Sequence, residues 1–284
     1  RRGLAREDVF TVVIDVAKTD SADYADIVLP AASHFEHEEI FCAYGQQYIQ
    51  RAAPVIVPVG EALPNTEIFR RLARRFGFND PMFQASDAEL MDDAIDGTDP
   101  RLGGQRPSEL PIATVLSMSE MGPRIGFERR PKTKSGKIEL KSAYLTDNFD
   151  APLPLFQPLA ADEDKDATYP FALVTPSSNW RTNSMFGGLA KSDPVPFLEM
   201  HPDDAATRDL KDGQQVRVHN ELGEVFLPLR ITDSVAKGVL LSYKGAWMRT
   251  TTNGQTVSAL APTTKADLSE GACYNDTRVA VAAA

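Results

Sequence analysis

The chain has 284 residues and a formal net charge of −10, from 40 acidic and 30 basic side chains. This length is enough for about two domains with cores of their own. Lys and Arg form no basic run, and no apolar stretch approaches the roughly 20 residues that span a bilayer, so we expect neither a nucleic-acid partner nor a membrane span. Two cysteines are too few for an iron–sulfur cluster, which needs about four thiolates, and we expect Cys42 and Cys273 to be buried apolar side chains.

The first residues have the pattern of a parallel α/β sheet. Residues 10–16, FTVVIDV, and 25–31, ADIVLPA, are apolar without alternation, which is typical of strands buried on both faces. A short helix is expected to start between them at Thr19 or Asp20. The chain lacks an initial Met and enters the first strand almost at once. We therefore expect these strands to end a doubly wound sheet whose earlier strands lie outside this chain.

An amphipathic helix is predicted for residues 64–77, PNTEIFRRLARRFG. Asn65 or Thr66 is expected to cap its first turn, Gly77 to stop it, and its arginines to form the solvated face. Its apolar residues recur at helical spacing. They are Ile68, Phe69, Leu72 and Phe76.

Weaker signals follow this helix. Residues 86–96 predict a second short helix, residues 97–130 a loop, and residues 135–142, SGKIELKS, a short strand. Because the sheet is expected to be incomplete, the first 150 residues should expose apolar surface. The proline-rich, acidic segment 151–169 is typical of a linker between a first domain, 1–150, and a second, 170–284.

The second domain is predicted to be mainly β. Alternation places Val225, Leu227, Leu229 and Ile231 on one strand face, and NELG at 220–223 predicts a tight hairpin turn. One helix is predicted at 202–213, with His201 as its cap. Short strands around a single helix are typical of a small closed barrel. The strands are expected at 171–175, 197–200, 214–220, 224–231 and 239–243.

A loop of small polar side chains follows the first strand of this domain. A loop of small polar residues at a strand end is one way in which a backbone holds an anionic ligand. The alternative is an ordinary polar turn. Trp180 and Arg181 either add to such a site or pack across the barrel mouth, and Trp247 either flanks a ligand or closes the core. The candidate binding residues of the loop are Thr175, Ser177, Ser178, Asn179, Asn183 and Ser184.

His34 and His37 lie among three glutamates, Glu36, Glu38 and Glu39. An H-x-x-H pair with carboxylates is one pattern of a metal site. A surface helix without metal is the simpler interpretation. No Ser/His/Asp or Cys/His arrangement has the spacing of a nucleophilic site, and we assign no catalytic residue and no metal ligand in this chain.

Several blocks, in order along the chain, resemble the molybdopterin oxidoreductases of the dimethyl sulfoxide reductase superfamily. Residues 19–39, TDSADYADIVLPAASHFEHEE, resemble the family's T-x-T-A-x-x-A-D-I-V-L-P-A block, with Ser21 where Thr is usual. The P-x-G-E step at 58–61 and SGKIEL at 135–140 follow it. Residues 201–225, HPDDAATRDLKDGQQVRVHNELGEV, match the P-x-D-A…G…V-x-V-x-N-x-x-G core of the last domain.

This resemblance implies the C-terminal portion of a catalytic subunit. Residues 1–150 would be an α/β remnant, the last part of the central α/β and middle domains. Residues 170–284 would be a double-psi β-barrel of the aspartate decarboxylase-like type that binds molybdopterin dinucleotide. The complete protein would hold molybdenum or tungsten on two molybdopterin guanine dinucleotides (bis-MGD), with any 4Fe-4S cluster in the missing N-terminal part. The fragment alone is expected to be inactive and to hold no cofactor tightly. The partners implied are the remainder of the catalytic subunit and an iron–sulfur electron-transfer subunit.

The resemblance also implies cofactor contacts for single residues. It supports the polar loop and adds Thr19, Ser21 and Trp247. Ser258 stands where relatives often carry Asn. Its hydroxyl keeps one donor but lacks the paired donor and acceptor of an amide. Asp267 keeps an acidic position that could accept from guanine N1 and N2. The segment with Gly271, Tyr274 and Arg278 fits the family's closing segment.

Two other interpretations of the sequence remain open. The chain could be a separately encoded cofactor-binding subunit that a second chain completes. It could also be a double-psi barrel that binds protein and no cofactor, because one fold hosts unrelated functions.

Overall fold

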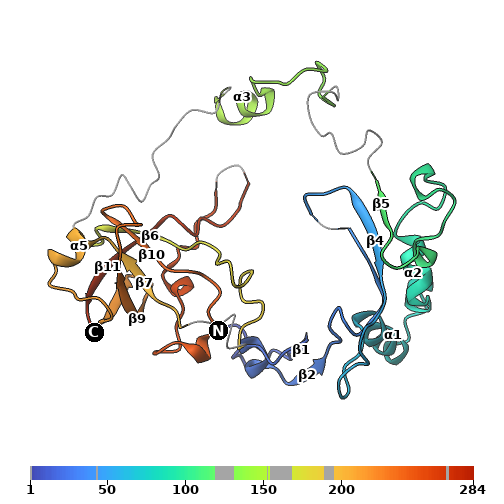
Figure 1. The fold of residues 1–284 in the computed structure, drawn as a ribbon, viewed down its shortest axis with the longest axis horizontal. Helices are drawn as coiled ribbons and strands as arrows, with labels where there is room; N and C mark the ends of the chain where they lie inside the picture. Colours follow the sequence, from blue (N-terminus) through green and yellow to red (C-terminus); the bar gives the residue numbers. More distant parts are fainter. Residues whose placement is uncertain are drawn as a thin grey trace. The chain divides into compact units, whose positions relative to one another are not determined.

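The computed structural model describes residues 2–42, 44–118, 131–151, 153, 168–188, 195–266 and 269–284. These residues form two compact units, Arg1–Leu153 and Pro154–Ala284 (Figure 1). Most of the predicted linker 151–169 and part of the predicted loop 97–130 lie outside the described residues. No helix in the described ranges is long and apolar enough to cross a membrane.

The first unit begins with a two-stranded parallel sheet. Strand β1 (Val12–Asp15) pairs in parallel with β2 (Ile27–Pro30), and the 3₁₀ helix η1 (Asp20–Tyr24) connects them. The two predicted strands and the short helix are therefore confirmed. Their predicted burial is wrong for this chain, because Val12 is 43% and Ile27 44% exposed. Within the described residues only two strands pair in this sheet, which leaves much of its apolar surface uncovered, and the expected apolar surface of this unit is confirmed.

A second sheet was not predicted. Strands β3 (Glu39–Phe41), β4 (Tyr48–Ala52) and β5 (Val115–Ser117) form an antiparallel sheet in the order β3-β4-β5. Ile49 of β4 is buried in it. Because β5 lies inside the segment predicted to be a loop and pairs with a distant strand, no local pattern indicated it.

Helix α1 (Asn65–Phe76) ends at Gly77, which has a φ of 74° as the predicted stop requires. The predicted cap is wrong, since Pro64 occupies the N-cap position and makes no side-chain cap bond. The apolar face is only partly covered, because Ile68 is buried while Phe76 is 70% exposed. The arginine face is not wholly solvated either, since Arg70 donates to the Asp87 carboxylate at 2.6 Å.

The second predicted helix is confirmed as α2 (Asp87–Asp93), which Ser86 and Glu89 start with a reciprocal capping box. The predicted strand at 135–142 is wrong. There the Ser135 hydroxyl donates to Glu139 at 2.8 Å, in a turn that leads into helix α3 (Ala143–Phe149). The remaining short helices of this unit are η2 (Pro81–Phe83), η3 (Pro100–Leu102) and η4 (Pro107–Glu109).

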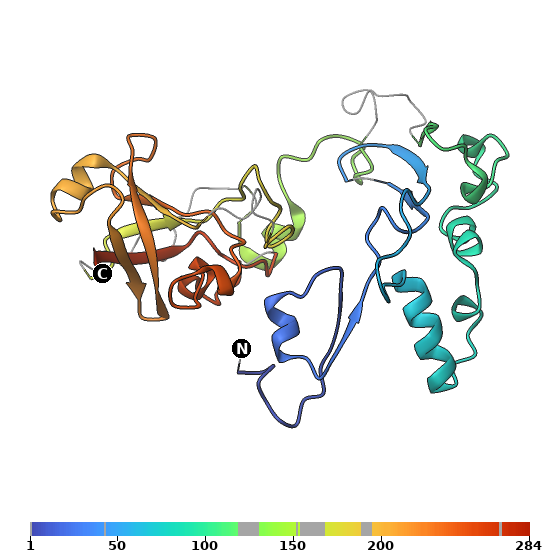
Figure 2. The same ribbon diagram turned by 60° about the horizontal axis from the view of Figure 1, so that its bottom comes forward.

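The second unit is a closed barrel of six strands in the order β10-β6-β11-β8-β9-β7 (Figures 1 and 2). Pairs β10–β6 and β7–β9 are parallel and the other four are antiparallel. The mainly β barrel and its five predicted strands are confirmed, and the sixth, β11, was not predicted. The strands are β6 (Phe171–Val174), β7 (Leu198–Met200), β8 (Gln215–Asn220), β9 (Gly223–Ile231), β10 (Val239–Leu241) and β11 (Thr277–Ala283).

Alternating side chains of these strands fill the barrel. Val225, Leu227 and Leu229 of β9 are at most 3% exposed, as their period of two predicts. Each such side chain stabilises the fold by roughly 1.5–3 kcal/mol relative to full exposure. The β8–β9 turn at residues 220–223 is also confirmed, since Asn220 pairs with Gly223.

Helix α5 (Pro202–Ala206) is shorter than predicted, and Asp203 N–H donates to His201 Nδ1 at 3.1 Å, which confirms the predicted cap. Two further 3₁₀ helices, η5 (Met248–Thr250) and η6 (Val257–Leu260), precede β11. The prediction of buried cysteines is wrong, because Cys42 is exposed and Cys273 half-buried.

Candidate functional site

The polar loop after β6 starts at one end of the barrel, where other segments fix its base. Ser242 N–H, just past β10, donates to Val174 O at 3.1 Å, and Lys244 N–H donates to Pro176 O at 3.1 Å. Thr175 N–H donates to Asn275 Oδ1 at 3.1 Å. The loop therefore leaves the barrel between residues 242–247, which we call the extension of β10, and the segment before β11.

A cavity of about 350 Å³ lies beside this loop. Two of the predicted binding residues, Ser178 and Asn179, line it, so the structure brings their hydroxyl and amide to one place. Trp180 and Arg181 also line it, and Arg181 is only 6% exposed. The other lining residues are Val195, Pro196, Phe197, Arg230 and Tyr243.

A second part of the cavity lining combines a cation with aromatic rings. The Arg230 guanidinium carbon lies 3.7 Å from the centroid of the Phe197 ring, and its Nη1 lies 3.6 Å from Glu199 Oε1. The Phe197 and Tyr243 rings meet edge to face, with centroids 5.9 Å apart. A planar cation held over a ring can donate to phosphate or to a heterocycle edge.

No sequence pattern predicted that these residues line the cavity. Phe197, Arg230 and Tyr243 come from three strand regions that meet only when the barrel closes. The one local signal was the position of Arg230 between inward-facing Leu229 and Ile231, because alternation directs it to the other face of β9.

One buried polar atom at this end of the barrel lacks a partner. The side chain of Ser242 is fully buried, and its Oγ has no hydrogen-bond partner among the described residues. Such an atom costs about 1–3 kcal/mol unless something bonds to it. Its neighbour Tyr243 lines the cavity. Ser242 itself does not line the cavity, and it is the hydroxyl, amide and guanidinium groups of Ser178, Asn179 and Arg230 in the lining that fit a polar, anionic ligand.

The other predicted site residues lie elsewhere. Asn183 and Ser184 contact the segment that carries Trp247, and Trp247 is 7% exposed and does not line the cavity. Ser258 is exposed on η6, and Asp267 lies outside the described residues. Four more are not among the residues that line the cavity. They are Thr175 and Ser177 at the loop base, and Thr19 at the start of η1 with Ser21 within it.

The histidine–glutamate cluster has a structural role. Residues 33–38 form turns, so the predicted surface helix is wrong. Glu36 accepts from Ser33 N–H and from Val59 N–H, both at 2.7 Å, and these backbone donors hold the pKa of Glu36 below its usual range. Glu38 forms an ion pair with Arg51. Over the described ranges, no three His, Cys, Asp or Glu side chains are grouped as a metal site.

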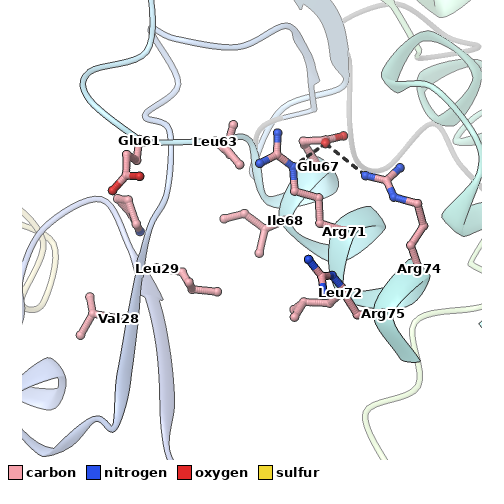
Figure 3. Close-up of a pocket in the computed structure, with 11 residues that line it drawn as sticks. Val28, Leu29, Glu61, Leu63, Glu67, Ile68, Arg71, Leu72, Arg74 and Arg75 are labelled. Atoms are coloured by element: carbon pink, nitrogen blue, oxygen red, sulfur yellow. Dashed lines mark hydrogen bonds and ion pairs between the residues drawn. The ribbon is translucent and has the colours of Figure 1, made fainter. Parts of the chain in front are cut away.

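A larger cavity, about 730 Å³, lies in the first unit between β2 and α1 (Figure 3). Its walls are apolar at Val28, Leu29 and Ile68, and Figure 3 shows Arg71 and Arg74 directed toward Glu67. The Glu67 carboxylate lies 2.8 Å from Arg71 and 3.6 Å from Arg74, which offsets their charge. This cavity contains none of the predicted site residues. We therefore take the cavity beside the polar loop, called the barrel cavity below, as the candidate site.

Two family models match the chain. Residues 171–278 match the molydopterin dinucleotide binding domain, and residues 2–75 match molybdopterin oxidoreductase. The cavity thus falls within the first match, which also covers the barrel except for most of β11.

Curated relatives match over most of this chain. It is 36% identical to the probable oxidoreductase YoaE of Bacillus subtilis, over 99% of this chain and 41% of that protein. It is 31% identical to the F420-dependent formate dehydrogenase subunit alpha of Methanocaldococcus jannaschii, over 81% of this chain and 33% of that protein. It is 29% identical to the dimethyl sulfoxide/trimethylamine N-oxide reductase of Rhodobacter capsulatus, over 83% of this chain and 32% of that protein.

A solved structure, acetylene hydratase from Pelobacter acetylenicus, superposes with a TM-score of 0.76 at 21% identity. It covers all of this chain, which in turn covers 41% of that structure. At this identity the likeness concerns the fold. The chain spans about two fifths or less of the length of each of these proteins.

Proposed function

The chain belongs to the molybdopterin oxidoreductase family, and from that premise we propose that it is the C-terminal portion of the catalytic subunit of a molybdenum or tungsten oxidoreductase. Its barrel unit is a molybdopterin dinucleotide-binding domain. The remainder of the subunit, in this proposal, supplies the metal ligand and any 4Fe-4S cluster. An iron–sulfur subunit is the proposed electron-transfer partner.

We place the guanine dinucleotide end of the cofactor in the barrel cavity. The observation that carries this is the stack of Arg230 on Phe197, which faces the same cavity as Ser178 and Asn179. Arg donors suit a pyrophosphate, aromatic rings suit a purine face, and hydroxyl and amide groups suit its polar edge. Asp267 stays a predicted partner of the guanine edge.

The bound cofactor supplies the redox chemistry through its metal. The residues of this chain bind and orient the dinucleotide. Their geometry matters because a small displacement of a bound group changes its reactivity. We assign no proton transfer to this chain, and we expect the isolated fragment to be inactive.

Calorimetric titration with GDP, as a probe of the dinucleotide end, tests this placement. Arg230→Gln should weaken binding about tenfold, because one charge-assisted hydrogen bond is worth about 1.5–3 kcal/mol. Arg217→Gln is the matched control, since Arg217 is also an ion-paired barrel-strand arginine but does not line the cavity. Absence of saturable GDP binding, or equal losses in both variants, would contradict the placement.

The whole protein provides a second test. Denaturation of the product of the native gene should release guanine nucleotide, pterin and molybdenum or tungsten. A native product of the 31.1 kDa of this chain, with none of these, would instead support a separate subunit or a protein-binding barrel.

A further inference from the structure

We propose that Trp247 is a positioning residue that, together with Gly187 and Gly245, holds the polar loop against the extension of β10. We call the contacts of these three residues with the loop the clasp. This inference rests on the proposed function, because the loop is a wall of the cavity assigned to the dinucleotide. The sequence left open whether Trp247 flanks a ligand or closes the core. The contacts favour a third role, in which the indole fixes the loop that lines the site.

The indole holds the far part of the loop by one hydrogen bond and by close packing. Trp247 Nε1–H donates to Ser184 O at 2.8 Å, and the side chain is only 7% exposed. Its ring occupies the space that a side chain at residue 187 would need. A Cβ added to Gly187 would lie 1.9 Å from Trp247 Nε1, so only glycine permits this approach.

The second glycine brings two backbones into contact. A Cβ on Gly245 would lie 1.9 Å from Asn183 O, and Gly245 has a φ of 93°, which L side chains rarely adopt. On the loop side, Asn183 and Phe186 have φ values of 51° and 62°. These left-handed residues cost free energy and persist where surrounding contacts hold them. The clasp supplies such contacts.

The extension of β10 therefore holds the described part of the loop at two points. Lys244 N–H bonds to Pro176 O at the base, and Trp247 bonds to Ser184 at the far part. The cavity-lining residues Ser178 and Asn179 lie between these two points. Fixing these two points restricts the positions that the side chains of Ser178 and Asn179 can take, so Trp247 acts on the cavity through the loop.

Hydrogen exchange measured by mass spectrometry on the 284-residue chain tests the clasp. Trp247→Phe keeps a ring but removes the Nε1 donor, and should speed exchange in a peptide covering 176–188 roughly fivefold, as loss of one hydrogen bond implies. Gly245→Ala should have a larger effect because its Cβ meets backbone. Gly254→Ala is the matched control, since Gly254 also has a positive φ, 63°, but a Cβ added there would meet no atom within 4 Å.

A peptide covering β8 and β9 serves as the internal reference. An increase confined to the loop supports the clasp, whereas unchanged loop exchange, or a rise that equals that of the reference peptide, overturns it. The same variants are titrated with GDP. Faster loop exchange with unchanged GDP affinity would overturn the positioning role of Trp247. A lack of GDP binding by the unmodified chain would reject the cofactor placement. In that case the exchange result alone still decides whether the clasp holds the loop.

Discussion

Asn220, the last residue of β8, joins three segments of the barrel that are distant in sequence. Its Nδ2 donates to Leu260 O at 2.9 Å and to Arg278 O at 3.1 Å, and its Oδ1 accepts from Leu222 N–H at 3.0 Å. One amide thus ties the hairpin turn to η6 and to β11. An amide supplies the two donors and the acceptor that these three bonds use, whereas a single hydroxyl has only one donor.

Asn220→Ala removes all three hydrogen bonds. At about 1 kcal/mol each, the free energy of unfolding of the barrel should fall by about 3 kcal/mol. With a urea dependence of about 1.5 kcal/mol/M, the unfolding midpoint should fall by about 2 M. Asn220→Asp should cost at least as much, because a carboxylate would face two carbonyl oxygens that have lost their donor.

Tryptophan fluorescence measures this unit selectively. The chain has two tryptophans, Trp180 and Trp247, and both lie in the barrel unit. Asn179→Ala is the matched control, because Asn179 is exposed in the loop, and its midpoint should stay within about 0.3 M. A midpoint for Asn220→Ala within about 0.5 M of the unmodified chain would refute the reasoning.

Three further outcomes are expected. Leu240→Ala should destabilise the barrel by about 2–5 kcal/mol, because Leu240 is fully buried between β6 and β7; a fluorescence-detected urea midpoint that hardly moves would contradict this. The lowered pKa of Glu36 means that its carboxylate contributes stability above the ordinary carboxyl pKa and loses it as the pH falls through the folded-state value. Glu36→Gln should therefore make the acid loss of circular dichroism, from about pH 5 downward, less steep, and an identical acid transition would count against this. Exposed Cys42 should react with a thiol reagent before half-buried Cys273, which peptide mapping would show, and equal rates would be inconsistent with the structure.

The sequence by itself determined the local elements of this protein. Gly77 ends α1, Ser86 begins α2, and His201 caps α5, because each effect depends on backbone groups a few residues away. The alternation in β9 likewise fixed which side chains enter the core. The order of the family blocks gave the membership and the expectation of a dinucleotide-binding barrel. Ser178 and Asn179 were predicted for the same reason, since they follow a predicted strand end, and their binding role stays a prediction.

Only the tertiary structure decided which distant residues come into contact. Strand β11 closes the barrel by pairing with both β6 and β8, and Arg230 joins Phe197 and Ser178 at one cavity, through contacts between residues far apart in sequence. The role of Trp247 depends in the same way on the space left by Gly187. The predicted strand at 135–142 did not form, and the faces of β1 and β2 are exposed, although both segments have the sequence pattern of strands. A strand pattern states a preference, but pairing and burial require neighbours, and these are supplied by distant residues.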